Sequence, residues 1–417
     1  MAFPHYSVRR YVSLSVSLQP FKEKYFSLLW GGAFLSSMGF WVQALGQSWQ
    51  VLQLTNSALL LGLVTFAATL PNVVLSPFGG VVADRFDRRH LLICTQTIYM
   101  TTATLLGILT TLHIIAVWQI FLIALINGTF NSAGQPAWQA FIGDLVRREQ
   151  LKQGIALNSV QFNLSRFIGP ALGGISIGLF GIAGNYYLNA LSYVAVIIPL
   201  ILMRPDLKQH TIQRQSMWRS LREGLTYVKR RPTLQIILLL QLIIAFLVFP
   251  YATLLPVFAR DIFHIGAPGL GLLNAASGMG ALTGAVLLML LSQGLEGGRP
   301  LLIALCVVGG LASIAFALSS ILDVSLLILI VLGSCTVMSS TVTNGTLQML
   351  TPKEMRGRVL SIWIMVAFGL GPCGNLLAGW IAQSFGARLT LALGGSLCAT
   401  VALLVVCFKK ARKRESE

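Results

Sequence analysis

Residues 76–93 read SPFGGVVADRFDRRHLLI and place a compact group of charges between two apolar stretches. The charged residues of this group are Asp84, Arg85, Asp87, Arg88 and Arg89. Charge is scarce elsewhere, because Asp, Glu, Lys and Arg make up only 10% of the 417 residues and hydrophobic residues make up 55%. A soluble domain carries about 25% charged residues. With a mean hydropathy of +0.76, the composition indicates an integral membrane protein.

Twelve apolar stretches are long enough to cross a bilayer as helices, which takes roughly 20 residues each. We expect them at 26–53, 58–82, 91–111, 116–138, 156–180, 185–203, 233–258, 267–291, 300–319, 325–349, 359–382 and 387–408. A β-barrel would instead show segments of alternating polarity. The sequence therefore predicts an all-α membrane protein.

The chain is expected to divide into two six-helix bundles, at 26–203 and 233–408. The polar linker 204–232 carries eight basic residues, and its segment SMWRSLREGLTYVKRR predicts an amphipathic helix. The apolar face of that helix would consist of Trp218, Leu221, Leu225 and Val228. Such a helix lies on the inner leaflet or, alternatively, is a solvated linker. Residues 1–25 lack a signal-peptide pattern and are interpreted as a cytoplasmic tail, and 409–417 as a basic C-terminal tail.

Lys and Arg are distributed unevenly over the two sides that this topology creates. If the N-terminus is cytoplasmic, 27 of the 30 fall in cytoplasmic tails and loops, Arg260 and Arg388 fall outside, and Arg166 lies within a helix. Basic residues are retained on the cytoplasmic side. We therefore expect a multi-pass protein of the inner cell membrane with both termini cytoplasmic. Its net charge of +17 indicates contact with anionic lipid rather than with nucleic acid.

The two halves of the chain resemble one another. GPALGG at 169–174 recurs as GPCGN at 371–375, and each follows a loop that contains a Glu and basic residues. Internal repeats of this kind are typical of transporters whose binding site lies between the repeats near the membrane midplane.

The charged loop resembles the signature loop of the major facilitator superfamily, Gly-x-x-x-Asp-Arg-x-x-Arg-Arg. Its positions are filled by Gly80, Asp84, Arg85, Arg88 and Arg89. More narrowly, TLPNVVLSPFGGVVADRFDRR, GQPAWQAFIGDLV, RFIGPALGG and TPKEMRGRV resemble the branch that includes siderophore exporters and macrolide-efflux proteins. The resemblance covers residues from about 20 to 408. It implies twelve helices in two pseudo-symmetric bundles that work by alternating access.

The resemblance also implies a cytoplasmic gate. Asp84 would face the N-terminus of helix 11 near Gly357, where the helix dipole favours negative charge. The basic residues of the loop would pair with Asp144 or Glu149, only while the cytoplasmic side is closed. The second half would contribute Glu354, Arg356 and Arg358. The alternative is that the basic residues merely fix topology, which would require neither Gly80 nor Asp84.

The repeated glycine–proline motifs predict bends in helices 5 and 11. The residues are Gly169, Pro170, Gly173 and Gly174 in the first half and Gly371 and Pro372 in the second. Proline removes a hydrogen bond and glycine permits close helix packing. The motif resembles one found in exporting antiporters, although Ser165 replaces a glycine of that pattern.

Polar residues in helices 1, 4, 7 and 10 are candidates for the substrate pathway, because the resemblance implies that these helices line a central cavity. They are Gln43, Gln47, Gln50, Asn127, Asn131, Gln135, Gln241 and Asn344. The alternative role is hydrogen bonding between helices, worth about 0.6 kcal/mol each. The sequence leaves both roles open.

Arg166 is the single charge that we place inside a predicted helix. An Arg near the bilayer centre costs roughly 2.5–3.5 kcal/mol to insert, so its side chain faces a cavity or extends to the interface. All 13 carboxylates fall in tails, loops or helix ends. Proton coupling is therefore expected to run through Asp144 and Arg166.

The sequence thus predicts a secondary active exporter of a small organic molecule, such as a siderophore, a macrolide or another drug. We expect a monomer without a cofactor, driven by the proton gradient. The six cysteines lie in apolar stretches without CxxC spacing, which argues against a metal site. An importer or lipid flippase on the same fold is the alternative. A membrane enzyme or sensor is disfavoured, because no Walker or HExxH motif is present.

Overall fold

The N-terminal half of the molecule is a bundle of long helices. The computed structural model describes residues 19–203, 217–291 and 298–414, and all regular structure within them is helical. After the short turn η1 (Gln19–Lys22), the bundle consists of α1 (Lys24–Thr55), α2 (Ala58–Arg85), α3 (Arg88–Thr111), α4 (Val117–Leu145), the short turn η2 (Arg148–Gln150) and α5 (Leu151–Leu202). Ser57 caps α2 and Asp87 caps α3 by accepting a hydrogen bond from a backbone N–H of the first turn.

Helix α5 is a hairpin rather than a single rod. Gly181 has a φ of 68° and a ψ of −177°, which only glycine adopts readily. Beyond it, Asn185 Nδ2 donates to Gly173 O at 3.2 Å. Twelve residues of straight helix would separate these groups by about 18 Å. The chain therefore reverses at Gly181, between the two helices expected at 156–180 and 185–203.

The C-terminal half contains two helices that are interrupted by π-helical turns. Its elements are α7 (Pro232–Ile243), η3 (Ile244–Val248), α8 (Tyr251–Val257), η4 (Phe258–Ile262), α9 (Gly266–Leu291), α10 (Gly298–Leu318), α11 (Leu322–Leu350), α12 (Lys353–Ile364), η5 (Met365–Gly369), α13 (Gly371–Phe385) and α14 (Ala387–Arg414). Pro250 precedes α8, and Pro372 lies in the first turn of α13, where its missing N–H breaks no helical hydrogen bond. The bend expected at Gly371 and Pro372 coincides with the break between α12 and α13.

Ten helical segments of the described residues are long and apolar enough to cross a membrane. The expected count of twelve requires α5 to be counted as two spans and α4 to be added. Among those ten, the segment Gln153–Leu202 contains the reversal at Gly181 and is 50 residues long. Helix α4, which carries Asn127, Asn131 and Gln135, is not among those ten. The all-α membrane fold is confirmed.

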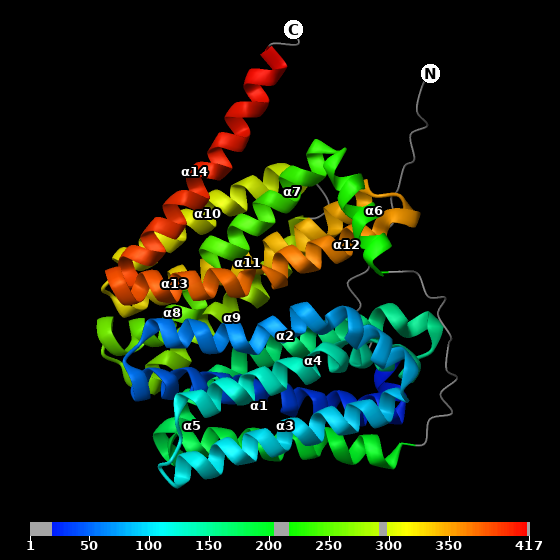
Figure 1. Ribbon diagram of the computed structural model, residues 1–417, viewed down its shortest axis with the longest axis vertical. Helices are drawn as coiled ribbons and strands as arrows, with labels where there is room; N and C mark the ends of the chain where they lie inside the picture. Colours follow the sequence, from blue (N-terminus) through cyan, green and yellow to red (C-terminus); the bar gives the residue numbers. More distant parts are fainter. Residues whose placement is uncertain (1–18, 204–216, 292–297, 415–417) are drawn as a thin grey trace.

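The two halves lie side by side with their helices roughly aligned (Figure 1). We call one end of the molecule the charged end: it contains the turns between α2 and α3 and between α4 and α5, and the start of α12. The opposite end contains the turn at Asn56–Ser57, the reversal at Gly181, the start of α9 and the turn at Gly386. Successive helices alternate between the two ends, which is why the basic loops of the sequence gather at one of them.

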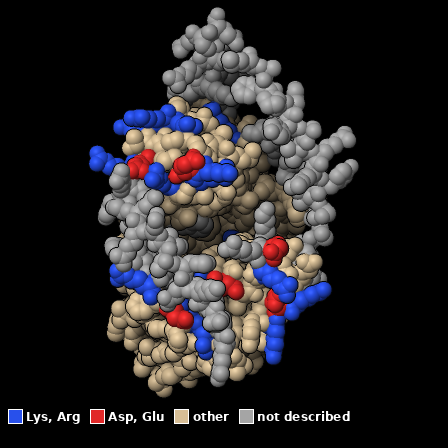
Figure 2. Space-filling view, turned by 90° about the vertical axis from the view of Figure 1, so that its right-hand side faces the viewer, with Lys and Arg blue, Asp and Glu red and all other residues tan. Residues whose placement is uncertain are grey.

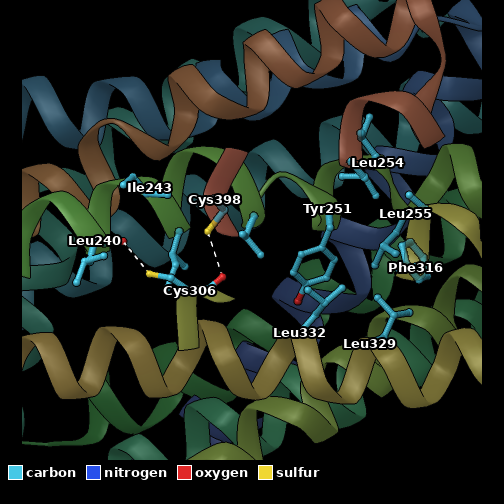
Figure 3. Packing of buried hydrophobic residues seen from close by; sticks show 14 of the residues in the cluster. Leu240, Ile243, Tyr251, Leu254, Leu255, Cys306, Phe316, Leu329, Leu332 and Cys398 are labelled. Carbon is cyan, nitrogen blue, oxygen red and sulfur yellow. Dashed lines mark hydrogen bonds between the residues drawn. The ribbon is translucent and has the colours of Figure 1, made fainter. Parts of the chain in front are cut away.

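The largest buried cluster lies in the C-terminal half. Tyr251, Leu254, Phe258 and Phe316 are fully buried in it. Figure 3 shows that Tyr251 projects between Leu332 and the neighbouring leucines, and that Cys398 Sγ donates to Cys306 O from the adjoining helix at 3.4 Å. The cluster also includes Leu45, Trp49 and Ala58 of the N-terminal half. The apolar core is therefore continuous between the halves at the opposite end.

The linker helix α6 (Met217–Lys229) packs against α12 of the C-terminal half. Arg358 Nη1 lies 2.7 Å from Glu223 Oε2, and a Cβ on Gly224 would lie 3.1 Å from Arg358 O. The buried face includes Gly224 and Val228, whereas Leu225 is exposed. Leu225 is thus available for contact with a lipid surface, and the predicted apolar face stays a prediction. The side chains of Trp218 and Leu221 lie outside the described residues.

Helix α14 extends through Arg414, so the basic residues from 409 to 414 continue the last helix rather than forming a separate tail. Lys and Arg are good helix formers and are favoured near a helix C-terminus. Residues 1–18 and 415–417 lie outside the described part of the chain.

Candidate functional site

A hollow opens between the two halves at the charged end. Figure 2 views this end and shows the hollow between the upper and lower parts of the molecule, with acidic and basic side chains around its rim. The upper part is the C-terminal half and the lower part is the N-terminal half. The candidate site is the space between the halves, which is reached from the charged end.

The opposite end is closed by backbone-to-backbone contact between α9 and the first arm of α5. We call the part of α5 before Gly181 its first arm and the part after Gly181 its second arm. A Cβ on Gly271 would lie 2.7 Å from Pro170 O and 2.9 Å from Gly174 Cα. Further toward the middle of the bilayer, a Cβ on Gly278 would lie 2.7 Å from Arg166 O. No side chain larger than hydrogen fits at either position of α9 without separating the helices.

A second contact of the same kind joins α2 to α13. A Cβ on Gly62 would lie 2.7 Å from Asn375 O, and one on Gly379 would lie 2.6 Å from Ala58 O. The two pairs of helices, α5 with α9 and α2 with α13, therefore hold the halves together on both sides of the hollow.

The glycines of GPALGG serve this packing. Gly169 and Gly173 adjoin α1, where an added Cβ would meet Trp41 Cβ at 2.6 Å and Val42 Cα at 3.1 Å. Gly174 adjoins α9. Within α5, the non-helical backbone lies at Gly181 and not at Pro170. The structure thus assigns these glycines to close helix contact, and the expected bend at Pro170 stays a prediction.

The charged loop makes its described contacts within the N-terminal half. Arg88 Nη1 lies 2.7 Å from Asp144 Oδ2, which joins the start of α3 to the end of α4. Arg89 donates from Nε to Leu200 O at 2.5 Å and from Nη2 to Ile201 O at 2.8 Å. These are carbonyls of the last turn of α5, which a cation complements electrostatically.

The expectation that the Arg88–Asp144 pair forms only while the charged end is closed is therefore wrong. The pair is present although that end is hollowed. Both residues belong to the same half, so a rigid rotation of one half against the other leaves their distance unchanged. A gate that depends on the closed state requires a contact between the halves.

The remaining gate candidates are not assembled in this conformation. The surroundings of Gly80 and the side chain of Asp84 are not described, although the backbone of both residues belongs to α2. Arg85, Glu149 and Glu354 are exposed. In the second half, Arg356 Nε donates to Thr351 O at 3.1 Å, and Arg358 pairs with Glu223 of the linker helix. Their gating roles stay predictions.

Four of the pathway candidates hydrogen-bond between helices of the same half. Gln43 accepts from Asn189, and Gln50 donates to Thr110 and accepts from Tyr186. Asn127 of α4 accepts a hydrogen bond from Thr102 of α3, and Gln241 of α7 accepts one from Thr343 of α11. Gln43, Gln50 and Gln241 are buried. The alternative role stated for these positions, interhelical bonding, is the one that the structure shows.

The other pathway candidates remain accessible. Gln47 and Asn131 are half-buried, and Gln135 is exposed. Asn344, also half-buried, accepts from Gln348 Nε2 at 2.5 Å on the next turn of α11. These residues are free to contact a ligand, and that role stays a prediction.

Arg166 lies halfway along the first arm of α5, fifteen residues from both Leu151 and Gly181. At 1.5 Å per residue, each end of the arm is about 22 Å away, which exceeds the reach of an Arg side chain. Its guanidinium carbon lies 5.8 Å from the centre of the Trp41 ring on α1. Its side chain is half-buried, and no ion pair joins it to a described carboxylate. The described carboxylates lie at helix ends, in turns or on the linker helix α6.

Trp41, beside Arg166, has a hydrogen-bond donor without an acceptor in the described part of the chain. Its indole Nε1 is buried and has no hydrogen-bond partner among the described residues. Phe162 packs edge-on against its ring at 6.1 Å. A guanidinium, an indole N–H and aromatic faces therefore converge at mid-membrane depth, beside the contact of α5 with α9.

A cavity of about 900 Å³ lies elsewhere, at the opposite end of the N-terminal half. It is bounded by α1, α3 and the reversal of α5, and Gln50, Thr110, His113 and Tyr187 are among its lining residues. It is separate from Arg166, and sequence reasoning did not predict it. Among the described residues, no three His, Cys, Asp or Glu side chains gather as a metal site would require.

The chain matches known proteins over nearly its whole length. The model of the transmembrane secretion effector family matches residues 15–417. The staphyloferrin A transporter of Staphylococcus aureus is 27% identical over 399 residues, which cover 94% of this chain and 98% of that protein. The enterobactin exporter EntS of Citrobacter koseri is 29% identical over 323 residues, 76% of this chain and 73% of that protein. The multidrug efflux pump Tap of Mycolicibacterium fortuitum is 24% identical over 354 residues, 82% of this chain and 85% of that protein.

Solved structures share the fold. The nucleoside transporter NupG, as its D323A mutant, superposes with a TM-score of 0.75 at 14% identity, covering 92% of this chain and 99% of that one. A POT family transporter in complex with a thioalcohol-conjugated peptide gives 0.75 at 11% identity, covering 93% and 96%. From the fold and the match over residues 15–417, this protein belongs to the transmembrane secretion effector family of the major facilitator superfamily and is a secondary transporter.

Proposed function

We propose that this protein exports a small anionic or electron-rich organic molecule by alternating access. In this proposal the charged end is cytoplasmic, and the structure represents the state that accepts substrate from the cytoplasm. The support for this orientation is the concentration of Lys and Arg at that end. Relatives named as an enterobactin exporter and a multidrug efflux pump support the direction.

The observation that carries the proposal is Arg166. A permanent cation at mid-membrane depth without a carboxylate partner is costly, and it is retained where it faces a ligand or a cavity. The geometry favours this role over extension to the interface, because both ends of the helical arm are too distant. The adjacent Trp41 offers a buried N–H and an aromatic face to the same ligand.

The proton gradient is the proposed energy source, and no cofactor enters the mechanism. The carboxylate that we propose for coupling is Asp144 at the charged end, which lies 2.7 Å from Arg88. Protonation of Asp144 would free Arg88. Because this pair lies within one half, its release would act on the packing of α3 against α4 and only indirectly on the hollow.

The experiment is transport by the purified protein in proteoliposomes, with a panel of anionic, neutral and cationic siderophores and drugs. We expect Arg166→Gln to raise the KM for anionic substrates about 10- to 100-fold, because a charge-assisted hydrogen bond contributes about 1.5–3 kcal/mol. The turnover of neutral compounds should change little. Arg147→Gln is the matched control, because Arg147 is a surface residue paired with Glu23 at 3.0 Å.

Several outcomes would contradict the proposal. Equal losses for neutral and anionic substrates in Arg166→Gln would assign Arg166 to structure. Net uptake, with substrate entering at the opposite end and leaving at the charged end, would favour the importer alternative. Reporter fusions at residues 210 and 417 that lie outside the cell would reverse the orientation.

A further inference from the structure

We propose that Arg260 is a latch that holds the opposite end of the molecule closed and has to release before that end can open. The inference rests on the alternating-access mechanism proposed above. Sequence reasoning gave Arg260 no role beyond membrane topology.

The guanidinium of Arg260 joins the two halves directly. Arg260 belongs to η4 in the C-terminal half, and its Nη1 donates to Leu52 O at 3.0 Å and to Asn56 Oδ1 at 2.6 Å, both in the N-terminal half. Its other nitrogens face its neighbour: Nε donates to Asp261 Oδ1 at 2.6 Å and Nη2 to Asp261 Oδ2 at 3.0 Å. Asp261 thus fixes the plane of the guanidinium, and the remaining nitrogen faces α1.

The acceptor on α1 suits a cation. Asn56 adopts a left-handed conformation with a φ of 50° and caps the helix by donating from its N–H to Leu52 O at 2.9 Å. Leu52 O therefore accepts both this cap bond and the bond from Arg260. The last carbonyls of a helix carry partial negative charge, which a guanidinium complements. The latch thus exploits the end of α1 rather than a side-chain carboxylate.

A second hydrogen bond holds the other side of the same turn. Ala58 N, in the first turn of α2, donates to Gln383 Oε1 of α13 at 2.9 Å. The C-terminal half therefore contacts both the end of α1 and the start of α2. Immediately inside these bonds, Leu45 and Trp49 are buried in the large apolar cluster of the C-terminal half. Separating the halves at this end would break both sets of polar bonds and expose that apolar contact.

These contacts differ from those of the charged loop at the other end. The Arg88 and Arg89 bonds stay within one half and survive any rigid rotation of the halves. The Arg260 and Gln383 bonds cross between the halves, so they can exist only in the state in which the opposite end is shut. That distinction makes Arg260 a positioning residue of the transport cycle.

The molecule contains a matched control for charge and location. Arg388 lies at the same end, and its Nη2 donates to Ser319 O at 3.3 Å and to Ser320 Oγ at 2.8 Å. All of these groups belong to the C-terminal half. Removing the charge of Arg388 should therefore leave the balance between the two states unchanged.

The test is a distance measurement on the full-length protein in lipid nanodiscs without substrate. Spin labels on non-canonical residues at positions 179 and 318 report the separation of the halves at the opposite end, since Leu179 and Leu318 are each 70% exposed. We expect Arg260→Gln to raise the ratio of open to closed populations at this end about tenfold relative to the wild type. Arg388→Gln should leave the distance distribution unchanged. Gln383→Ala should shift it in the same direction as Arg260→Gln.

The latch is wrong if Arg260→Gln gives the wild-type distribution, or if Arg388→Gln shifts it as much. If Arg260→Gln does not fold, Arg260→Lys decides the matter, because Lys keeps the charge but cannot hold Asp261 and α1 at once. An unshifted Arg260→Lys would then overturn the proposal. The measurement needs no transported substrate, so a failed export assay and a failed latch are separate outcomes.

Discussion

The contact of Gly271 with α5 allows the closed end to be forced open by one methyl group. In Gly271→Ala the new Cβ would lie 2.7 Å from Pro170 O and 2.9 Å from Gly174 Cα. Ordinary contact begins near 3.4 Å, so α5 and α9 have to separate by roughly 0.7 Å at this point. Both opposing atoms are backbone atoms, and no rotamer change relieves the clash.

The energetic consequence follows from overpacking. Extra methyl groups in a tight interface cost about 1–3 kcal/mol, which corresponds to about a 5- to 150-fold change in an equilibrium constant. Gly271 lies near the start of α9, at the end that is closed in this conformation. Because the strain arises while this end is shut, we expect the substitution to favour the state in which it is open.

Distances between labels at positions 179 and 318 measure this shift, and thermal unfolding of the same samples separates it from a general loss of stability. Gly345→Ala is the control, because Gly345 also lies within a helix but a Cβ there meets no atom within 4 Å. The control also reports the helix-propensity gain of about 1 kcal/mol that accompanies any such exchange. If the two variants have the same distance distribution, the close contact is not what holds this end shut.

Two further changes test the loop and the hairpin. Asp84→Asn should remove most transport activity in proteoliposomes while the protein still inserts and folds. The reason is that losing a charge–dipole contact of roughly 0.3–2 kcal/mol shifts the populations of the two states several-fold. Wild-type turnover by this variant would reject the gating role of Asp84. Asn185→Ala removes bonds to Val42 O at 2.9 Å and Gly173 O at 3.2 Å, so we expect the free energy of unfolding to fall by about 1–3 kcal/mol. An unchanged melting temperature would show that other contacts fix the hairpin.

The membrane helices could be predicted because their signal is local. A run of about twenty apolar residues has few alternatives in a bilayer. The reversal within α5 was also predicted, since the apolar stretches end on either side of Gly181. The π-helical turns were not predicted. Hydropathy does not register such turns, two of which lie shortly before Pro250 and Pro372.

The candidate pathway was predicted less well, for a geometric reason. Periodicity shows which residues share a face of a helix but not which neighbour that face meets. Gln43 and Gln50 do lie near one face of α1, yet that face meets the second arm of α5 and α3. The signal that could have revealed this is the sequence NYYLNALSY in the second arm, which supplies Tyr186 and Asn189 as partners.

Contacts between the halves could not be predicted from the sequence at all. Arg260 and Leu52 are separated by 208 positions, and Ala58 and Gln383 by 325. Each donor or acceptor is ordinary in its own segment. Only the packing of the two bundles gives these residues a common function.

The charged loop at residues 84–89 has two expected tasks, packing within the N-terminal half and proton coupling, and a charge reversal distinguishes them. Arg88 and Asp144 are 20% and 26% exposed, so their pairing contributes of the order of 1 kcal/mol. If the pair only fastens α3 to α4, Arg88→Asp and Asp144→Arg should each lower the melting temperature, and the double variant should restore both stability and transport. If Asp144 also carries the proton, the double variant should recover stability but still fail to accumulate substrate against a gradient. Full recovery of accumulation would exclude Asp144 from coupling.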